Sequence, residues 1–144
     1  MTVSSSHQPA ILPVARQGRV LVVDDDASIR EGMKLLLESV GLDVITHDSM
    51  ITLPLVMRTF RPDVLVLDID MPALSGVSFL RMSDRKAVTN SEASVILFSG
   101  IPVRHLADLA ESFGAEFITK CEEPREIGER VRRAVEIRRV TQVC

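Results

Sequence analysis

Short apolar runs, rich in β-branched residues, recur along the chain from residue 19 onward. Short runs of this kind are typical of β-strands, and runs without any polar member are typical of strands that are covered on both faces of a sheet. The longer segments between them repeat their apolar residues with a helical period. The strands that this pattern predicts are Val20–Val23, Asp43–Thr46, Val64–Leu67, Ser94–Phe98 and Glu116–Thr119.

An amphipathic helix is predicted after each of these strands. The first helix has the spacing of a capping box in Ser28 and Glu31 and ends at Gly41, a residue type that commonly follows a helix. Pro54 falls in the first turn of the second helix, where proline is tolerated. The predicted ranges are 29–40, Thr52–Phe60, Val77–Lys86, Val103–Phe113, which Gly114 closes, and Pro124–Arg139.

The alternation of strands and helices predicts the α/β class. Parallel strands joined by right-handed helical crossovers form a doubly wound sheet with helices on both faces. A five-stranded parallel sheet of this length suggests the strand order 2-1-3-4-5 of the flavodoxin-like fold, in which the first and third strands are neighbours at the topological switch point. Functional residues of such sheets lie beyond the carboxyl ends of the strands, so the residues that follow each strand are the first candidates.

The composition supports a single domain. Of 144 residues, 46% are hydrophobic and 26% charged, which is enough for one core. We expect residues 1–18 to form a flexible N-terminal arm, residues 19–140 to form the folded domain and residues 141–144 to form a C-terminal tail. No apolar run approaches the roughly 20 residues that span a bilayer, so no membrane association is expected. Cys121 and Cys144 cannot form a disulfide framework, which favours a reducing, cytoplasmic location.

The charge balance argues against direct binding of nucleic acid. The formal net charge is -3, whereas a phosphate-binding surface needs a concentrated positive field. The basic run RVRRAVEIRRV, residues 130–140, keeps Val131, Ala134 and Val135 on one helical face. This spacing predicts a helix whose arginines face solvent or a protein partner.

Polar and charged residues follow four of the predicted strands. Under the predicted strand order, these strand ends meet at one edge of the sheet. The residues are Asp24, Asp25 and Asp26 after the first strand, Asp68 after the third, Ser99 after the fourth and Lys120 after the fifth. Carboxylates held so close together repel one another unless some are protonated or a cation lies among them. Oxygen ligands favour a hard divalent ion, and few carboxylates suit Mg²⁺ better than Ca²⁺.

A carboxylate beside Mg²⁺, with a hydroxyl and an ammonium group nearby, is equipped for phosphoryl transfer. Its oxygen can attack phosphorus in line, while the metal ion and Lys120 offset charge on the equatorial oxygens. The product is an acyl phosphate on an aspartate. Asp26 fits a simpler role, because an aspartate just before a helix commonly caps it.

Four motifs, in this order, resemble the receiver domains of two-component response regulators. They are VLVVDD, which ends at Asp25, LDIDMPALSG, which contains Asp68, Pro72 and Gly76, ILFSG around Ser99, and FITK, which ends at Lys120. Each motif is short, but the four in sequence are specific. The resemblance covers residues 19–139, nearly the whole chain outside the N-terminal arm.

The resemblance implies a role for each matching residue. Asp68 corresponds to the phosphoacceptor, and Mg²⁺ is the implied cofactor. The implied metal ligands are Asp25 directly, Asp24 through a water molecule, Asp68, and the backbone carbonyl of Asp70, whose side chain is expected to face solvent. Ser99 corresponds to the switch hydroxyl, Lys120 to the lysine that contacts the phosphoryl group, and Phe117 to the switch aromatic that turns inward afterwards.

The resemblance also implies partners. A histidine kinase or a phosphotransfer protein would supply the phosphoryl group from a phosphohistidine. A downstream protein target would bind the face built from residues 103–113, 116–119 and 124–139, and a homodimer through the same face is a further expectation. Such a protein is not an enzyme with a separate substrate, although it assists its own phosphorylation and dephosphorylation.

Two alternatives remain open at the level of sequence. Asp68 and Asp70, with a later strand-end serine and lysine, also resemble haloacid-dehalogenase-type phosphatases, in which the first aspartate is the nucleophile and the second the acid/base. That family places its metal-binding acidic pair late, whereas Asp24 and Asp25 come early. The other alternative is a receiver-like scaffold that works without phosphorylation, because Cys121 replaces the proline that usually follows the lysine of receiver domains.

Overall fold

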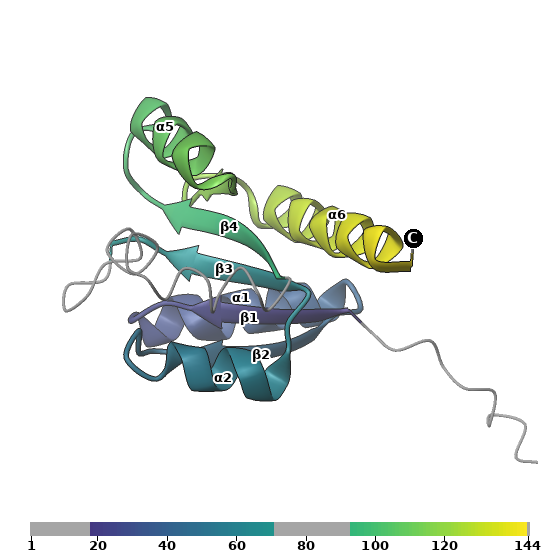
Figure 1. Ribbon diagram of the computed structural model, residues 1–144. Coiled ribbons are helices and arrows are strands. Elements are labelled where there is room, and N and C mark those ends of the chain that lie inside the picture. The colour runs from purple at the N-terminus through teal and green to yellow at the C-terminus, as the bar shows by residue number, and fades with distance from the viewer. Residues whose placement is uncertain (1–17, 71–92, 144) are drawn as a thin grey trace, which may run out of the picture.

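The computed structural model describes residues 18–70 and 93–143. The predicted helix Val77–Lys86 and the motif residues Pro72 and Gly76 lie outside the described residues. The labels of helices and strands follow Figure 1.

The strands form one parallel five-stranded sheet in the order β2-β1-β3-β4-β5, which confirms the predicted topology (Figure 1). The adjacent strands β1 and β3 pair with Val20 opposite Val64. All five residues of β3 are buried, as its continuously apolar sequence predicts. The bounds are Arg19–Val23 for β1, Asp43–His47 for β2, Val64–Asp68 for β3, Ser94–Ser99 for β4 and Glu116–Thr119 for β5.

Helices α1, α2, α5 and α6 cover the two faces of this sheet within the described residues (Figure 1). Their bounds are Ala27–Ser39, Leu53–Phe60, Val103–Phe113 and Pro124–Val143. The last helix continues beyond Arg139, where the sequence predicts its end, through to Val143. The other three agree with their predicted ranges to within two residues.

The capping box predicted for the first helix is wrong. Asp26, not Ser28, is the N-cap of α1, and its Oδ1 accepts hydrogen bonds from the backbone N–H groups of Ser28 at 2.8 Å and Ile29 at 3.3 Å. The reason is geometric, because the helix begins at Ala27 and Ser28 therefore already lies in its first turn. The expectation that Asp26 caps a helix is confirmed.

Glycines end two helices as the sequence predicts. Gly41 has φ 89° and Gly114 has φ 65°, in the left-handed region that glycine adopts with little strain. The N–H of Gly114 donates to the backbone carbonyl of Glu111 at 3.2 Å, and the N–H of Gly41 donates to that of Glu38 at 3.0 Å. Both chain reversals direct the following residues into a strand.

Two apolar cores lie on opposite faces of the sheet. The first joins α1 and α6 to one face, through residues such as Met33, Leu37, Ile127 and Val131. The second joins α2 and α5 to the other face, through residues such as Leu53, Met57, Leu106 and Ala110. Side chains from alternate positions of β1 and β3 enter each core in turn, as the period of a strand requires.

The chain enters β1 through a close contact with α6. A Cβ atom on Gly18 would lie 2.2 Å from Cγ1 of Val135, which is too close unless Val135 or the helix that carries it shifts. Val135 is itself 3% exposed and belongs to the core of this face. Gly18 therefore allows α6 to pack against the beginning of the first strand.

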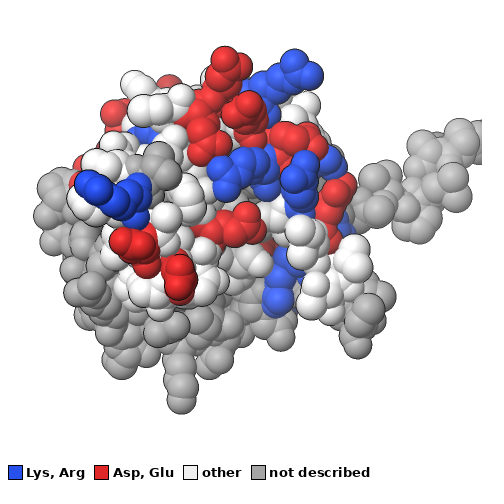
Figure 2. All heavy atoms as spheres, turned by 90° about the horizontal axis from the view of Figure 1, so that it is seen from above, with Lys and Arg blue, Asp and Glu red and all other residues white. Residues whose placement is uncertain are grey.

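Acidic and basic side chains alternate over the described part of the surface that carries α5 and α6 (Figure 2). On α6, Arg132 forms ion pairs with both Glu129 and Glu136. The arginines predicted to lie on a solvated helix face are therefore partly balanced by glutamates of the same helix. Among the described residues, no helix is long and apolar enough to cross a membrane.

Candidate functional site

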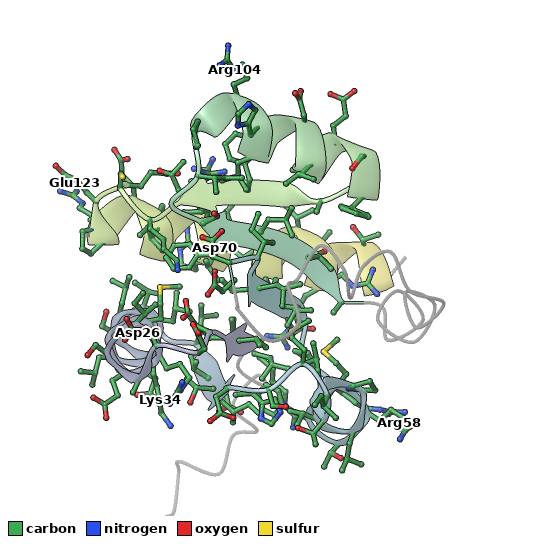
Figure 3. All side chains as sticks on the ribbon, turned by 90° about the vertical axis from the view of Figure 1, so that its left-hand side faces the viewer. Asp26, Lys34, Arg58, Asp70, Arg104 and Glu123 are labelled. Atoms are coloured by element: carbon green, nitrogen blue, oxygen red, sulfur yellow. The ribbon has the colours of Figure 1, made fainter. Side chains whose placement is uncertain are left out.

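The carboxyl ends of the parallel strands bring the predicted site residues to one edge of the sheet. Asp24 follows β1, Asp68 and Ser99 end β3 and β4, and Lys120 follows β5. Figure 3 looks toward this edge, with Asp70 near its centre and Asp26 at the beginning of α1. These four residues are far apart in the sequence but lie together in the structure, as the predicted strand order requires.

Three carboxylates form a cluster at this edge. One side-chain oxygen from each of Asp24, Asp25 and Asp68 lies within 4.8 Å of the others. Asp24 and Asp68 are each 1% exposed, whereas Asp25 is exposed. Three negative groups at this separation, two of them removed from water, need a compensating positive charge.

Part of that charge comes from Lys120. Its Nζ lies 3.3 Å from Oδ1 of Asp68 and 3.4 Å from Oδ2 of Asp24. Burial lowers the pKa of Lys120, but attraction to Asp68 and Asp24 outweighs this effect, and the net shift is upward. The ammonium group therefore stays charged and bridges the two buried acids.

One ammonium group does not neutralise the cluster. Burial raises the pKa of Asp68 from 3.8 to about 6, and repulsion from Asp24 adds to the rise. The backbone N–H of Asp70, which donates to Asp68 Oδ1 at 2.9 Å, and the charge of Lys120 hold the pKa down without cancelling the rise. Asp68 therefore carries an unfavourable negative charge at neutral pH, which a further cation would stabilise.

The donor set fits a hard divalent cation. Oδ1 of Asp24 accepts the backbone N–H of Asp26 at 2.9 Å, while its buried Oδ2 faces Nζ of Lys120 at 3.4 Å and accepts no hydrogen bond of good geometry from the described residues. A buried carboxylate oxygen without a hydrogen bond, beside two further carboxylates, is what a metal ligand provides. All-oxygen ligands of this number suit Mg²⁺ with water completing its coordination.

Ser99 lies at the same edge of the sheet, but its hydroxyl forms a hydrogen bond with Asp70 and not with Asp68, the candidate phosphoacceptor. Ser99 is fully buried, and its hydroxyl donates a hydrogen bond to Oδ2 of Asp70 at 2.7 Å. The same oxygen of Ser99 accepts the backbone N–H of Ile101 at 3.1 Å. The single hydroxyl proton of Ser99 is therefore already used.

The side chain of Asp70 has a partner that the sequence analysis missed. Asp70 is exposed, as expected, but its carboxylate also accepts the hydroxyl of Ser99 and, at 3.4 Å, the backbone N–H of Gly100. Its spacing from Asp68 gave no sign of this contact, because the contact joins the ends of two different strands. Phe117 is half-buried and packs against the core under α2 and α5.

Two further residues near Lys120 also escaped the sequence analysis. Glu122 accepts the backbone N–H of Thr119, and Arg130 of α6 donates to Glu122. The only signal in the sequence is a pair of opposite charges eight positions apart. The peptide bond that joins Lys120 to Cys121 is trans, and Cys121 is exposed with a free thiol.

Comparison with known proteins agrees with the geometry of the site. The family model described as response regulator receiver domain matches residues 20–132. The C4-dicarboxylate transport transcriptional regulatory protein DctD of Pseudomonas aeruginosa is 33% identical over 129 residues, which are 89% of this chain and 27% of that protein. A protein-glutamate methylesterase/protein-glutamine glutaminase of Anaeromyxobacter dehalogenans is 39% identical over 83 residues, 58% of this chain and 23% of that one.

Solved structures show the same similarity. The receiver domain of the Francisella response regulator 1452 superposes with a TM-score of 0.71 at 27% identity and covers 83% of this chain and 97% of its own. A response regulator receiver domain protein from Clostridium thermocellum gives a TM-score of 0.72 at 29% identity and covers 86% and 98%. The chain spans about a quarter of the length of the curated relatives DctD and the methylesterase.

Proposed function

Because the chain belongs to the response regulator receiver domain family, we propose that Asp68 accepts a phosphoryl group from a phosphohistidine donor. Receiver domains are signalling modules of two-component systems, and response regulators interact with histidine kinases and with downstream targets. The donor of this chain is a histidine kinase or a phosphotransfer protein. The observation that carries the proposal is the cluster of Asp24, Asp25 and Asp68 with Lys120 beside it.

The transfer is a substitution at phosphorus. An oxygen of the Asp68 carboxylate forms a bond to phosphorus while the bond from phosphorus to the imidazole nitrogen breaks, and the imidazole keeps the electron pair of that bond. Asp24, Asp25, Asp68 and the backbone carbonyl of Asp70 would hold Mg²⁺. The metal ion, when bound, supplies positive charge to the phosphoryl oxygens.

Lys120 and Ser99 act on the transferred group. The ammonium group of Lys120 already lies 3.3 Å from the Asp68 carboxylate, so it can offset negative charge on a phosphoryl oxygen attached there. Ser99 donates its hydroxyl proton to another phosphoryl oxygen after phosphorylation, for which it leaves Asp70. The order of the acidic residues and the family match favour this function over that of a haloacid-dehalogenase-type phosphatase.

The signal leaves through the face formed by α5, β5 and α6. Movement of Ser99 and Phe117 after phosphorylation reshapes this face, which then binds a downstream protein target or a second copy of the chain. We place the receiver at residues 19–140, with residues 1–18 as an N-terminal arm and residues 141–144 as a C-terminal tail, of which residues 141–143 extend α6. It works in the cytoplasm and binds neither nucleic acid nor membrane directly.

Chemical phosphorylation tests this function. The chain is incubated with Mg²⁺ and acetyl phosphate, and the phosphoryl groups per molecule are counted by intact mass spectrometry. At most one group is expected on the parent chain and none on the Asp68→Asn variant. The matched control is Asp26→Asn, which changes an acid outside the cluster, between β1 and α1, and keeps the labelling.

Three results would count against the proposal. Labelling of Asp68→Asn at the parental level would refute the assignment of the phosphoacceptor. Sustained hydrolysis of p-nitrophenyl phosphate would support the phosphatase alternative. A partner that binds the parent chain and Asp68→Asn equally, with and without phosphorylation, would support the scaffold.

A further inference from the structure

The turn between β5 and α6 holds Lys120 within a network of side-chain hydrogen bonds. Glu122 accepts the backbone N–H of Thr119 through Oε2 at 2.9 Å. Glu122 also accepts Nη1 of Arg130, with its two oxygens at 3.0 and 3.1 Å. Lys120 lies between Thr119 and Glu122 in the chain, so the hydrogen bond from Thr119 to the Glu122 carboxylate closes the turn that contains the lysine.

Arg130 connects the same turn to the strand before it. Its Nη2 donates to the backbone carbonyl of Phe117 at 2.6 Å, while its Nη1 binds Glu122. One planar guanidinium group therefore holds β5 and the turn after it at a fixed separation. Because Arg130 belongs to α6, the helix is tied to both.

The backbone of Lys120 is fixed on its other side by β4. The N–H of Lys120 donates to the carbonyl of Ser99 at 2.9 Å, and the N–H of Glu122 donates to the carbonyl of Thr119 at 3.2 Å. With its backbone held on both sides, the side chain of Lys120 reaches the two buried acids at 3.3 and 3.4 Å. The position of its ammonium group thus depends on the shape of this turn.

The pair differs from the other ion pairs of α6. The side chain of Glu122 is 21% exposed, whereas Glu129 and Glu136, which pair with Arg132, are 48% and 61% exposed. The pairs of Arg132 join residues of one helix, through hydrogen bonds within α6. Partial burial and two bonds to the backbone of β5 distinguish Glu122 and Arg130 from such surface pairs, which contribute little.

We propose that Glu122 and Arg130 are a pair of positioning residues that fixes the ammonium group of Lys120 against Asp24 and Asp68. The inference rests on the proposed function of Asp68 and names what orients the lysine for it. Loss of either partner frees the turn, and the ammonium group then spends less time beside the two acids. Phosphoryl transfer slows for this reason, while the three carboxylates remain in place.

The test compares Glu122→Ala with the parent chain in two measurements. The first is the rate constant of phosphorylation at saturating acetyl phosphate and Mg²⁺, which we expect to fall about tenfold, because displacement of a catalytic group by even 1 Å is costly. The second is the dissociation constant of Mg²⁺ by isothermal titration calorimetry. We expect Mg²⁺ to bind about two- to fivefold more tightly, because a displaced ammonium group repels the metal ion less.

These opposite changes separate positioning from general damage. A variant that merely folds less well would bind Mg²⁺ more weakly and react more slowly. Glu123→Ala is the matched control, because Glu123 is the adjacent acid, is exposed, and projects away from the centre of the site (Figure 3). Arg130→Lys is a second variant, whose single ammonium group cannot bind Glu122 and Phe117 as the guanidinium fork does.

A double-mutant cycle with Lys120 decides the question. If the pair acts through the lysine, Glu122→Ala changes neither the rate constant nor the Mg²⁺ affinity in a Lys120→Ala background. Independent effects that multiply in the double variant would overturn the proposal. If acetyl phosphate fails to label the parent chain, the proposed function fails instead, and the cycle in Mg²⁺ affinity alone still decides whether the pair positions Lys120.

Discussion

At the scale of single residues, burial and charge act against each other at Asp68. Burial and the nearby Asp24 raise its pKa from 3.8 to about 6, although Lys120 and the backbone N–H of Asp70 stabilise the carboxylate. The charged form of Asp68 is thus less stable in the folded chain than in the unfolded one. Such a destabilised carboxylate is expected at a site that binds a cation and accepts a phosphoryl group, because functional sites commonly hold groups with strongly shifted pKa values.

A dependence of stability on pH follows from that shift. Below pH 3.8 Asp68 is protonated in both states, and between 3.8 and about 6 only the folded state keeps the proton. Stability contributed by this group is therefore lost as pH rises through that window. We expect Asp68→Asn to raise the free energy of unfolding relative to the parent, by a margin that grows across this range to about 1 kcal/mol or more.

Urea unfolding in the presence of EDTA, at several pH values, measures this margin. Subtracting the parent from Asp68→Asn at each pH removes the contribution of the other titrating groups. A margin that stays constant or shrinks as pH rises from 4 to 6 would contradict the expected electrostatics. Added Mg²⁺ is expected to stabilise the parent more than the variant, since the variant has one carboxylate less.

The bond between Ser99 and Asp70 gives a second prediction. Ser99 has one hydroxyl proton, which it donates to Asp70 at 2.7 Å, so donation to a phosphoryl oxygen requires that this bond break. Asp70→Ala removes both the competing acceptor and a negative charge near the incoming anion. We expect phosphorylation by acetyl phosphate to be about three- to tenfold faster, from the usual worth of a hydrogen bond to a charged group.

The rate constant at saturating Mg²⁺ is the measurement for this prediction. Asp70→Asn serves as the control, because its side-chain carbonyl can still accept the hydroxyl while the charge is gone. An intermediate rate for Asp70→Asn is the expected result. A slower rate for Asp70→Ala would show that the carboxylate assists the transfer rather than withholding Ser99.

The sequence allowed some site residues to be predicted and hid others. Asp24, Asp68 and Lys120 could be placed together because each is attached to a strand end, and strand ends are fixed by topology. The contacts of Asp70 and Glu122 could not, because they depend on how side chains turn within loops. Their partners are 29 residues away for Asp70 and eight for Glu122, with no periodic pattern to reveal them.

At the scale of helices and strands, patterns of apolar residues were more informative than local capping motifs. Four of the strands are one residue longer than predicted and the fifth, β5, agrees fully, because short runs rich in β-branched and apolar residues mark strands even at the sheet edges. The beginning of α1 was misassigned, since Asp26 and Ser28 are both good caps and the spacing of Ser28 and Glu31 favoured the wrong one. Propensity alone cannot decide between two adjacent caps.

This misassignment supplies a test at the scale of the helix. Asp26 accepts two backbone N–H groups at the beginning of α1, whereas Ser28 lies inside the first turn. Asp26→Ala is expected to lower the free energy of unfolding by about 1 kcal/mol, and Ser28→Ala to change it by less than about 0.5 kcal/mol. Urea unfolding of both variants gives the comparison, and an equal or larger loss for Ser28→Ala would restore the capping box.

At the scale of the whole molecule, the strand order determines where chemistry can occur. Asp24 and Asp68 are 44 positions apart in sequence and share a site because β1 and β3 are adjacent in the centre of the sheet. Lys120 and Ser99 join them from β5 and β4. The alternation of strands and helices predicted this order, which is why the location of the site could be predicted before its detailed hydrogen bonding.

The layers on the two faces link this edge to the rest of the fold. Arg130 and Val131 are neighbours in α6, and the first binds the backbone of β5 while the second lies in the core shared with α1. A movement of the turn that carries Lys120 would therefore act directly on α6, which packs along the sheet (Figure 1). This continuity supports the proposal that phosphorylation acts on partner binding through α5, β5 and α6.

The most direct test of the account locates the phosphoryl group itself. The chain is phosphorylated with acetyl phosphate and Mg²⁺, the acyl phosphate is reduced with borohydride, and the peptides are sequenced by mass spectrometry. We expect homoserine to replace aspartate at position 68 alone, and only when Mg²⁺ is present. Homoserine at another aspartate, or at position 68 equally without Mg²⁺, would contradict it.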